Sequence, residues 1–525
     1  MSVPTRAGAG IELLYGAFHA NIQKMRSFAW LLTCSSLLAC RPEAPPPGGG
    51  AVPQESSIAS VSHTTAAAPA APVLRLNRRA TSPIHAVDWS PDGKWLATAC
   101  AGACGDDAKA EAQRVLVFEL PSLKLRSELS PNSEDMGDGR VHGVAFNADG
   151  SRLAISTHNG VALFRSSDFT RVADIDHFAI YGSFRFSPNG KYLGLSGVYG
   201  VVDVVDAVTG KAVLKDRLHN GAGSLSAGLA WTKDSNTLIV DGNANFGTWT
   251  PGAKKITAIG QGDSGTGWFE LSSDEKWLLL GEAESCVSGV YSMATRKLAH
   301  KVTTGAKPGT RVPPDSCRSG FSPNGVWVAA IDADAAVRLW QAGSAAKPVV
   351  VRPPAPIDGA EPVTLAFSPD GQRLLYAIGD VTGIWDIATQ RTADSKAPPG
   401  PLPRVEWLTP TVIALQEGEE TVYFDLARQE RTKRPAEAPE GSLDPSGKVR
   451  AVADGDLRLR RADGVELWLR TVLDGDKRTV VMVDSRGRVG GDEVLAASDV
   501  YDANGGAKLV PRVEAKVAER FFAGE

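Results

Sequence analysis

The sequence lacks the features that mark three classes of protein. No run of about 18 or more apolar residues occurs, so a membrane-spanning helix is not expected. The formal net charge of -4 offers no basic surface for nucleic acid, and it is not acidic enough to indicate a disordered chain. What the chain does have is 43% hydrophobic residues, 54 Gly and 33 Pro, which indicate a folded core built from short strands and many turns.

An apolar segment of moderate length follows Met25. It starts with Arg26 and ends at Cys40, which is the layout of a secretory signal segment. The last four residues, Leu-Leu-Ala-Cys at 37–40, resemble the lipobox of bacterial lipoproteins, in which the cysteine receives a diacylglyceryl group and the signal is cut before it. We therefore expect lipidation of Cys40, with residues 1–24 as an upstream extension. An ordinary signal peptide that contains a cysteine is the alternative.

A segment rich in Pro, Ala, Gly and Ser follows Cys40 and extends to Pro72. It has too little apolar bulk to fold, so residues 40–72 are interpreted as a tether between a signal region (1–39) and a folded domain. A flexible chain of this length spans about 30 Å. Arg41 stands where inner-membrane lipoproteins carry Asp, which favours the outer membrane, facing the periplasm or the cell surface.

One unit recurs along the chain: an apolar strand ending at a large anchor residue, a turn such as Ser-Pro-Asp-Gly, and a second apolar strand. Successive anchors lie 36 to 57 residues apart, and a second anchor follows 16 to 20 residues later in eight of the nine copies. Pro and Asp/Asn-Gly suit tight hairpin turns. The nine first anchors are Trp89, Phe146, Phe186, Trp231, Leu271, Phe321, Phe367, Trp407 and Leu443.

These units resemble WD40 repeats, and Trp385-Asp386 keeps the pair that names them. The resemblance implies an all-β fold, a β-propeller of degenerate repeats over residues 73–471, with eight blades favoured and seven to nine possible. We expect residues 73–76 to add an outer strand to the last blade. Residues 472–525 are predicted to be an extension with one hairpin and a short terminal helix.

His85 and His142 each precede an anchor by four residues. Because four residues along a strand keep the same face, both are predicted to be buried, hydrogen-bonding histidines rather than metal ligands.

Four cysteines lie outside the signal region: Cys100, Cys104, Cys286 and Cys317. In an exported protein an even number suggests disulfides. Cys286 and Cys317 fall in loops that open on the same face of neighbouring blades, and Cys100 and Cys104 share one loop. We predict both pairs as disulfides, with free thiols or a metal pair as the alternatives.

Two insertions break the regular spacing and bring acidic residues to one face of adjoining blades. They carry Asp106, Asp107, Glu134, Asp135 and Asp138. Since loops often carry binding functions, these residues are the candidate surface for a protein partner or a cation. The alternative is a solvated acidic loop with no ligand, because the spacing does not match an EF-hand.

The sequence favours a scaffold for protein–protein interaction in the cell envelope, with no catalytic site, metal or cofactor. The alternatives are an enzyme, either a hydrolase or a quinoprotein-like dehydrogenase, and a sensor of cations or small ligands. Gly262–Gly265 is similar to the nucleophile region of trypsin-like proteases, and 206–211 resembles a blade motif of quinoprotein dehydrogenases. Neither match is accompanied by the other residues that its family requires.

Overall fold

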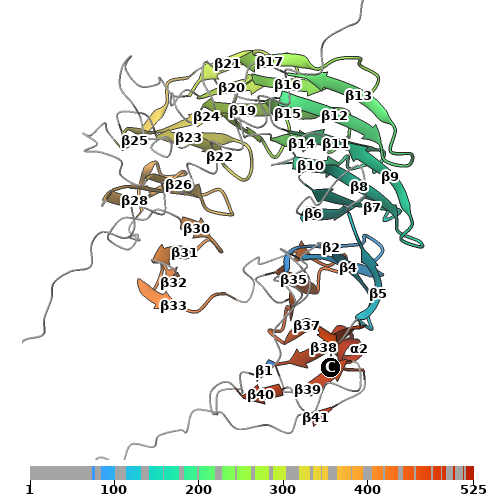
Figure 1. Ribbon diagram of the computed structural model, residues 1–525. Helices are drawn as coiled ribbons and strands as arrows, with labels where there is room; N and C mark the ends of the chain where they lie inside the picture. The colour runs from blue at the N-terminus through green and yellow to red at the C-terminus, as the bar shows by residue number, and fades with distance from the viewer. Residues whose placement is uncertain are drawn as a thin grey trace, which may run out of the picture. The chain divides into compact units, whose positions relative to one another are not determined.

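The repeated strand–turn–strand units fold into a series of antiparallel sheets in this computed structural model (Figure 1). Residues 70–525 form one unit, separate from residues 1–69. The described part of the chain comprises residues 74–76, 84–100, 114–131, 141–157, 159–176, 183–197, 200–218, 228–242, 245–261, 267–282, 288–302, 319–331, 335–344, 346–352, 363–379, 381–393, 405–417, 420–435, 442–453, 457–474, 477–485, 488–491, 500–502, 512–513 and 516–524.

Eight sheets each consist of four consecutive strands paired antiparallel in chain order, and we number them blades 1 to 8. Blade 1 contains β2 (Ile84–Trp89), β3 (Trp95–Cys100), β4 (Val115–Glu119) and β5 (Lys124–Leu129). Blade 2 contains β6 (Val141–Phe146), β7 (Arg152–Thr157), β8 (Gly160–Arg165) and β9 (Arg171–Asp176). Blade 3 contains β10 (Ser183–Phe186), β11 (Tyr192–Ser196), β12 (Val201–Asp206) and β13 (Ala212–Arg217). Blade 4 contains β14 (Leu229–Trp231), β15 (Leu238–Gly242), β16 (Asn245–Trp249) and β17 (Thr257–Gln261).

The next four blades repeat this order. Blade 5 contains β18 (Gly267–Leu271), β19 (Trp277–Glu282), β20 (Ser288–Ser292) and β21 (Leu298–Lys301). Blade 6 contains β22 (Ser319–Phe321), β23 (Trp327–Ile331), β24 (Val337–Gln341) and β25 (Val349–Arg352). Blade 7 contains β26 (Val363–Phe367), β27 (Arg373–Ile378), β28 (Val381–Asp386) and β29 (Arg391–Thr392). Blade 8 contains β30 (Val405–Trp407), β31 (Val412–Glu417), β32 (Glu420–Asp425) and β33 (Glu430–Thr432).

The ninth sheet, blade 9, starts like the others and is then extended. Its first four strands are β34 (Ser442–Leu443), β35 (Val449–Ala453), β36 (Leu457–Arg461) and β37 (Glu466–Asp474). The extension adds β38 (Lys477–Asp484), β39 (Arg488–Gly491) and β41 (Arg512–Val513), the last of these parallel to β39. Within the described residues the nine sequence copies therefore give nine sheets, which confirms the predicted all-β propeller class and its range of blade number.

Apolar side chains join each sheet to a neighbour. One buried cluster combines blades 1 and 2, with Val117 and Phe146 fully or almost fully buried, and similar clusters join each following pair up to blades 7 and 8. A further cluster joins blade 1 to blade 9, where Leu116 packs with Leu459 and Leu467. The first and last blades thus share a core although they lie at opposite ends of the repeat region.

The first turn of each blade is held by its own polar side chains. In blade 1 the Ser90 hydroxyl donates to Asp92 at 2.7 Å and accepts the Trp95 amide at 2.8 Å. Gly93 takes a positive φ of 69°, which glycine adopts without strain. The same Ser/Thr–Asp/Asn pair closes the turns of blades 3 to 7, so the repeated turn residues are there to rigidify the hairpin.

The predictions for the two ends of the domain had different outcomes. The predicted C-terminal hairpin is present as β38 and β39, and the predicted helix as α2 (Val517–Ala523). The expected outer strand of the last blade was wrong: β1 (Leu74–Leu76) pairs with β40 (Val500–Asp502), and the outer neighbour of β37 is β38. The outer edge of β37 is occupied by β38, the strand that directly follows it across a short turn, which leaves β1 to pair with β40 instead.

Candidate functional site

The first strand of each blade pairs on one side only, so it leaves an edge of unpaired backbone groups. The anchors Trp89, Trp231 and Trp407 satisfy three of these groups across blade boundaries. The indole N–H of Trp231 donates to the carbonyl of Arg185 at 3.1 Å, and that of Trp407 to Ala366 at 3.1 Å. Each bond runs from an anchor to the residue directly before the anchor of the preceding blade. The anchors therefore act as interblade hydrogen-bond donors as well as core residues.

Two carboxylates form the reciprocal contact toward the following blade. Asp88 accepts the amide of Phe146 at 2.6 Å, and Glu270 accepts the amide of Phe321 at 3.1 Å. Burial raises the pKa of Asp88 from 3.8 to about 6, although the hydrogen bond from Phe146 acts in the opposite direction. Burial also raises the pKa of Glu270, again against its hydrogen bond. Perturbed carboxyls can indicate an active site, but here each one has a structural task at an edge strand.

These carboxylates were missed from the sequence, although a signal for them exists. Asp88 and Glu270 both lie directly before a first anchor, within a strand that is otherwise apolar. An acidic residue at that one register position predicts an interblade contact, because it must face the blade opposite to the one that the anchor faces.

The two predicted histidines illustrate how a bulge changes a face. The register between β2 and β3 skips a residue at His85, and that between β6 and β7 skips one at His142. Both side chains are exposed, so the prediction of burial was wrong, because the bulge removes the alternation on which it rested. The hydrogen-bonding part holds for His85, whose Nε2 donates to the carbonyl of Val141 at 3.1 Å.

The first and third turns of every blade lie at the same end of its strands, because consecutive strands run antiparallel. We call the surface made by these turns the turn face. Neighbouring turns are tied together: the Asn189 amide donates to the Ser235 hydroxyl at 2.9 Å, and the Lys233 amide donates to the Glu275 carboxylate at 2.9 Å. Ser235 and Glu275 stand at positive φ where other copies have glycine. The side chains of Ser235 and Glu275 thus form contacts between blades that glycine could not form, and these contacts offset the backbone strain.

The opposite ends of the strands carry the loops in which the candidate binding residues were predicted. Asp106, Asp107, Glu134, Asp135, Asp138, Cys104, Cys286 and Cys317 lie outside the described residues, as do Cys40 and Gly262–Gly265. Cys100 is the last residue of β3, but its side chain is not described. The predicted disulfides and the acidic surface therefore stay predictions.

The segment 206–211 that resembles a quinoprotein motif is used for a hairpin turn between β12 and β13. The Asp206 carboxylate accepts the Thr209 amide at 2.9 Å and its hydroxyl at 2.8 Å. In blade 7 the Asp386 carboxylate accepts the Thr389 amide and hydroxyl, both at 2.8 Å. Two blades with the same turn chemistry indicate a structural motif rather than a cofactor site.

Helix α2 covers the boundary between blades 1 and 9. Val517, Ala518 and Phe521 are fully or almost fully buried in the cluster that these two blades share. The Phe522 ring lies edge-on to Trp89, with 6.4 Å between centroids.

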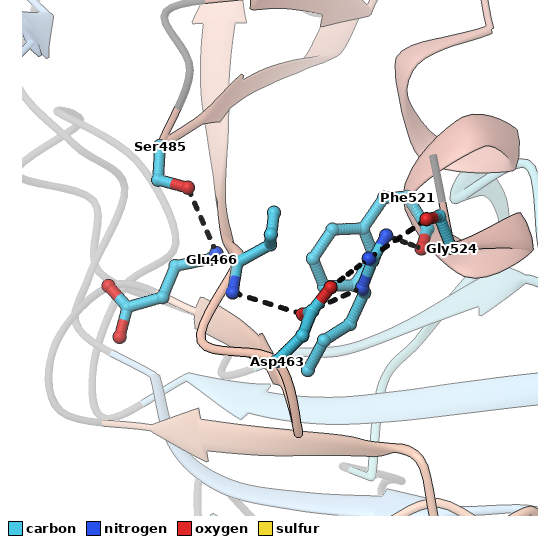
Figure 2. A network of polar contacts seen from close by, with 7 residues as sticks. Asp463, Glu466, Ser485, Phe521 and Gly524 are labelled. Atoms are coloured by element: carbon cyan, nitrogen blue, oxygen red, sulfur yellow. Dashed lines mark hydrogen bonds and ion pairs between the residues drawn. The ribbon is translucent and has the colours of Figure 1, made fainter. Parts of the chain in front are cut away.

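Arg461 of blade 9 holds the end of this helix. Its guanidinium donates to the carbonyls of Phe521 and Gly524, each at 3.0 Å, and to the Asp463 carboxylate at 3.1 Å (Figure 2). A cation at a helix C-terminus satisfies carbonyls that have no partner within the helix. Arg461 was not singled out in the sequence because its two partners on the helix, Phe521 and Gly524, are 60 and 63 residues away.

Two kinds of feature are absent from the described residues. No group of three or more His, Cys, Asp or Glu side chains is placed there to hold a metal ion. No helix in the same part of the chain has the length and apolar character needed to cross a membrane.

Comparison with known proteins identifies one repeat directly. The profile of the WD domain, G-beta repeat family matches residues 72–108. A comparison with curated proteins finds no match.

Among solved structures, similar chains occur in "Crystal Structure of Mitotic Checkpoint Complex" (18% identity, TM-score 0.33, covering 67% of this chain and 99% of that one) and in "Structure of Dos1 propeller" (10%, 0.40, 67% and 94%). A third is "Crystal structure of the eukaryotic initiation factor" (14%, 0.41, 74% and 94%). These similarities say nothing of what this chain binds. The nine sheets built on one repeated unit make this chain a β-propeller, and one of its repeats matches the WD domain, G-beta repeat family.

Proposed function

We propose that this chain is a lipid-anchored protein of the cell envelope, favoured at the outer membrane, whose propeller serves as a non-catalytic scaffold for protein–protein interaction. The observation that carries the proposal is the blade-to-blade frame. Trp231, Trp407 and Trp89 tie blades together at their first strands, and Ser235 and Glu275 tie them at their turns. A frame fixed at both levels holds its loops and turns at constant spacing, which is what a multi-site binding surface needs.

The anchor is proposed from the sequence at Cys40 and the tether after it. The acyl chains of a lipid-modified Cys40 would bury enough methylene groups, at about 0.8 kcal/mol each, for stable attachment. The acidic loop residues Asp106, Asp107, Glu134, Asp135 and Asp138 are the proposed partner surface.

The proposal is tested by cross-linking in membranes of cells that express the chain from Met25. We expect one partner protein to be cross-linked to the wild-type chain in a constant molar ratio. The amount of cross-linked partner should fall in a variant in which the five acidic loop residues become Asn or Gln. A variant with Asp425→Asn and Glu430→Gln, on the turn face of blade 8, is the control. Equal recovery by both variants would remove the acidic surface from the account, and absence of any partner at constant ratio would contradict the scaffold.

A further inference from the structure

The turn face carries an uneven distribution of charge. In blades 3, 4 and 5 the turns and their flanking residues contain eight basic and four acidic side chains, whereas those of the other six blades contain eleven of each. The excess of four positive charges thus comes from three consecutive blades. Because the whole chain has a formal net charge of -4, the remainder carries -8. The basic residues are Lys191, Lys211, Lys233, Lys254, Lys255, Lys276, Arg296 and Lys297.

The seven lysines of this set are all exposed, whereas the four acidic groups serve the turns themselves. Asp206 and Asp234 accept hydrogen bonds from residues of their own turns, and Glu275 accepts the Lys233 amide. Asp274 accepts the Ser272 hydroxyl and forms an exposed ion pair with Lys276. The carboxylates are therefore engaged within the turns. Two of the lysines are held as well, since Lys233 donates to the Ser273 carbonyl and Lys276 pairs with Asp274, but all seven lysines are exposed to solvent.

The first turns of these three blades are also tied to one another. The bond from the Asn189 amide to Ser235 joins the turns of blades 3 and 4, and the two bonds from Lys233 to Glu275 and Ser273 join those of blades 4 and 5. Beside Lys211, Val208 is 54% exposed at the tip of a turn. An exposed apolar side chain among lysines is typical of a surface that contacts the headgroup region of a bilayer.

We propose that the turn face of blades 3 to 5 is a docking surface for anionic phospholipid. Charge spread over six turns of three blades matches a planar anionic surface, to which each lysine contributes about 1 kcal/mol. The negative remainder of the chain is repelled from the same surface, so the domain would sit with one face toward the membrane. The choice of a membrane over an acidic protein rests on the proposed lipid anchor, which keeps the domain close to a bilayer.

The test uses the full chain with Cys40→Ala, which cannot be lipidated, and sedimentation with vesicles. One set of vesicles is phosphatidylcholine alone, and the other contains equal parts of phosphatidylcholine and phosphatidylglycerol. Binding to the first set measures any contribution of the apolar signal segment and is subtracted. The patch variant carries Lys211→Glu, Lys254→Glu and Lys255→Glu. The control carries Lys94→Glu, Lys124→Glu and Lys347→Glu, which change the net charge equally on the turns of blades 1 and 6.

We expect binding to the phosphatidylglycerol vesicles that weakens as salt is added, because screening shortens the reach of the charges. The patch variant should lose about tenfold or more in affinity, and the control should stay within about twofold. Equal loss in both variants, or no binding by the wild-type sequence, would overturn the proposal. Binding to poly-glutamate but not to the vesicles would also overturn it, in favour of an acidic protein. Melting temperatures of both variants establish that they are folded, and the lipidation of Cys40 is measured separately.

Discussion

The indole N–H of Trp89 in blade 1 donates to the carbonyl of Ser442 in blade 9 at 3.0 Å, across 353 residues of sequence. Ser442 precedes the ninth anchor just as Arg185 precedes the third and Ala366 the seventh, and those two carbonyls accept the indoles of Trp231 and Trp407. The contact between the two ends of the repeat region therefore has the same chemistry as a contact between consecutive blades. It also identifies the weak ninth copy as a true blade.

Replacing Trp89 with Phe should lower the free energy of unfolding by about 1–3 kcal/mol beyond the loss of ring size, because a partly buried carbonyl loses its donor. Trp385→Phe is the matched control. The indole N–H of Trp385 is buried and has no hydrogen-bond partner among the described residues, so its removal should cost packing only. Urea unfolding of the two variants gives the comparison. Equal destabilisation would show that the bond to Ser442 contributes nothing.

Asp88→Asn should remove a pH dependence of stability. Because burial raises the folded pKa of Asp88 from 3.8 to about 6, the folded state holds a proton between these values that the unfolded state releases. The wild type therefore gains stability as pH falls through this window, by up to about 2–3 kcal/mol from this group. The Asn variant keeps an oxygen for the Phe146 amide and should be the more stable one at pH 8.

The sign of this effect has an internal control at Asp386. Hydrogen bonds from the Thr389 amide and hydroxyl lower the pKa of Asp386, so its contribution is present above its ordinary pKa and is lost as pH falls through the folded value. Asp386→Asn should therefore remove a loss of stability at low pH, whereas Asp88→Asn removes a gain of stability at low pH. Unfolding midpoints of the wild type and both variants decide the matter, with the Asp88 effect read between pH 4 and pH 8 and the Asp386 effect read below pH 4. A wild-type slope for Asp88→Asn in the first window would contradict the assignment for Asp88.

Arg461→Met should loosen helix α2 from blade 9. The substitution keeps the aliphatic stem but removes the donors to Phe521 and Gly524, at an expected cost of about 1–3 kcal/mol. Faster hydrogen exchange at 517–523 is the direct readout. Arg428→Met is the control, since the pair that the exposed Arg428 side chain forms with Asp425 should contribute about 0–1 kcal/mol. If α2 exchanged at the wild-type rate, Arg461 would not hold it.

Gly343 lies in the third turn of blade 6, where a Cβ atom would come within 2.1 Å of the Trp277 ring of blade 5. Gly343→Ala should therefore separate these blades and cost clearly more than Gly252→Ala. Both glycines have positive φ, but a Cβ atom at Gly252 meets nothing within 4 Å, so only a backbone cost of about 1–2 kcal/mol is expected there. An equal decrease in melting temperature for the two variants would mean that blades 5 and 6 accommodate the added methyl group without a further loss of stability.

The fold could be predicted from the sequence because each blade repeats its own turn chemistry. Ser90, Asp92 and Gly93 specify a hairpin locally, and copies of this turn recur at nearly constant spacing. What could not be predicted depends on partners distant in sequence or on a change of register. His85 lost its expected face to a bulge, β1 paired with β40, and Arg461 found its partners on a helix more than 50 residues later.

The candidate site was less predictable than the fold. The two loops that carry the acidic residues are insertions within the repeat, so they have no repeated chemistry that would specify their geometry. The basic residues of the turn face are visible in the sequence, but the sequence alone does not indicate that they share a surface. Only the alignment of turns from blades 3, 4 and 5 at one end of their strands brings Lys191, Lys211 and Lys254 to one surface.

The most direct test of the proposed function is the intact mass of the protein extracted from membranes after expression from Met25 in a bacterial host, beside a Cys40→Ala variant. The account predicts a chain that begins at Cys40 and carries a lipid adduct, and it predicts that the variant lacks the adduct. An unmodified mass recovered from the soluble fraction would contradict the anchor. The propeller would then have to be considered as a secreted binding protein or an enzyme.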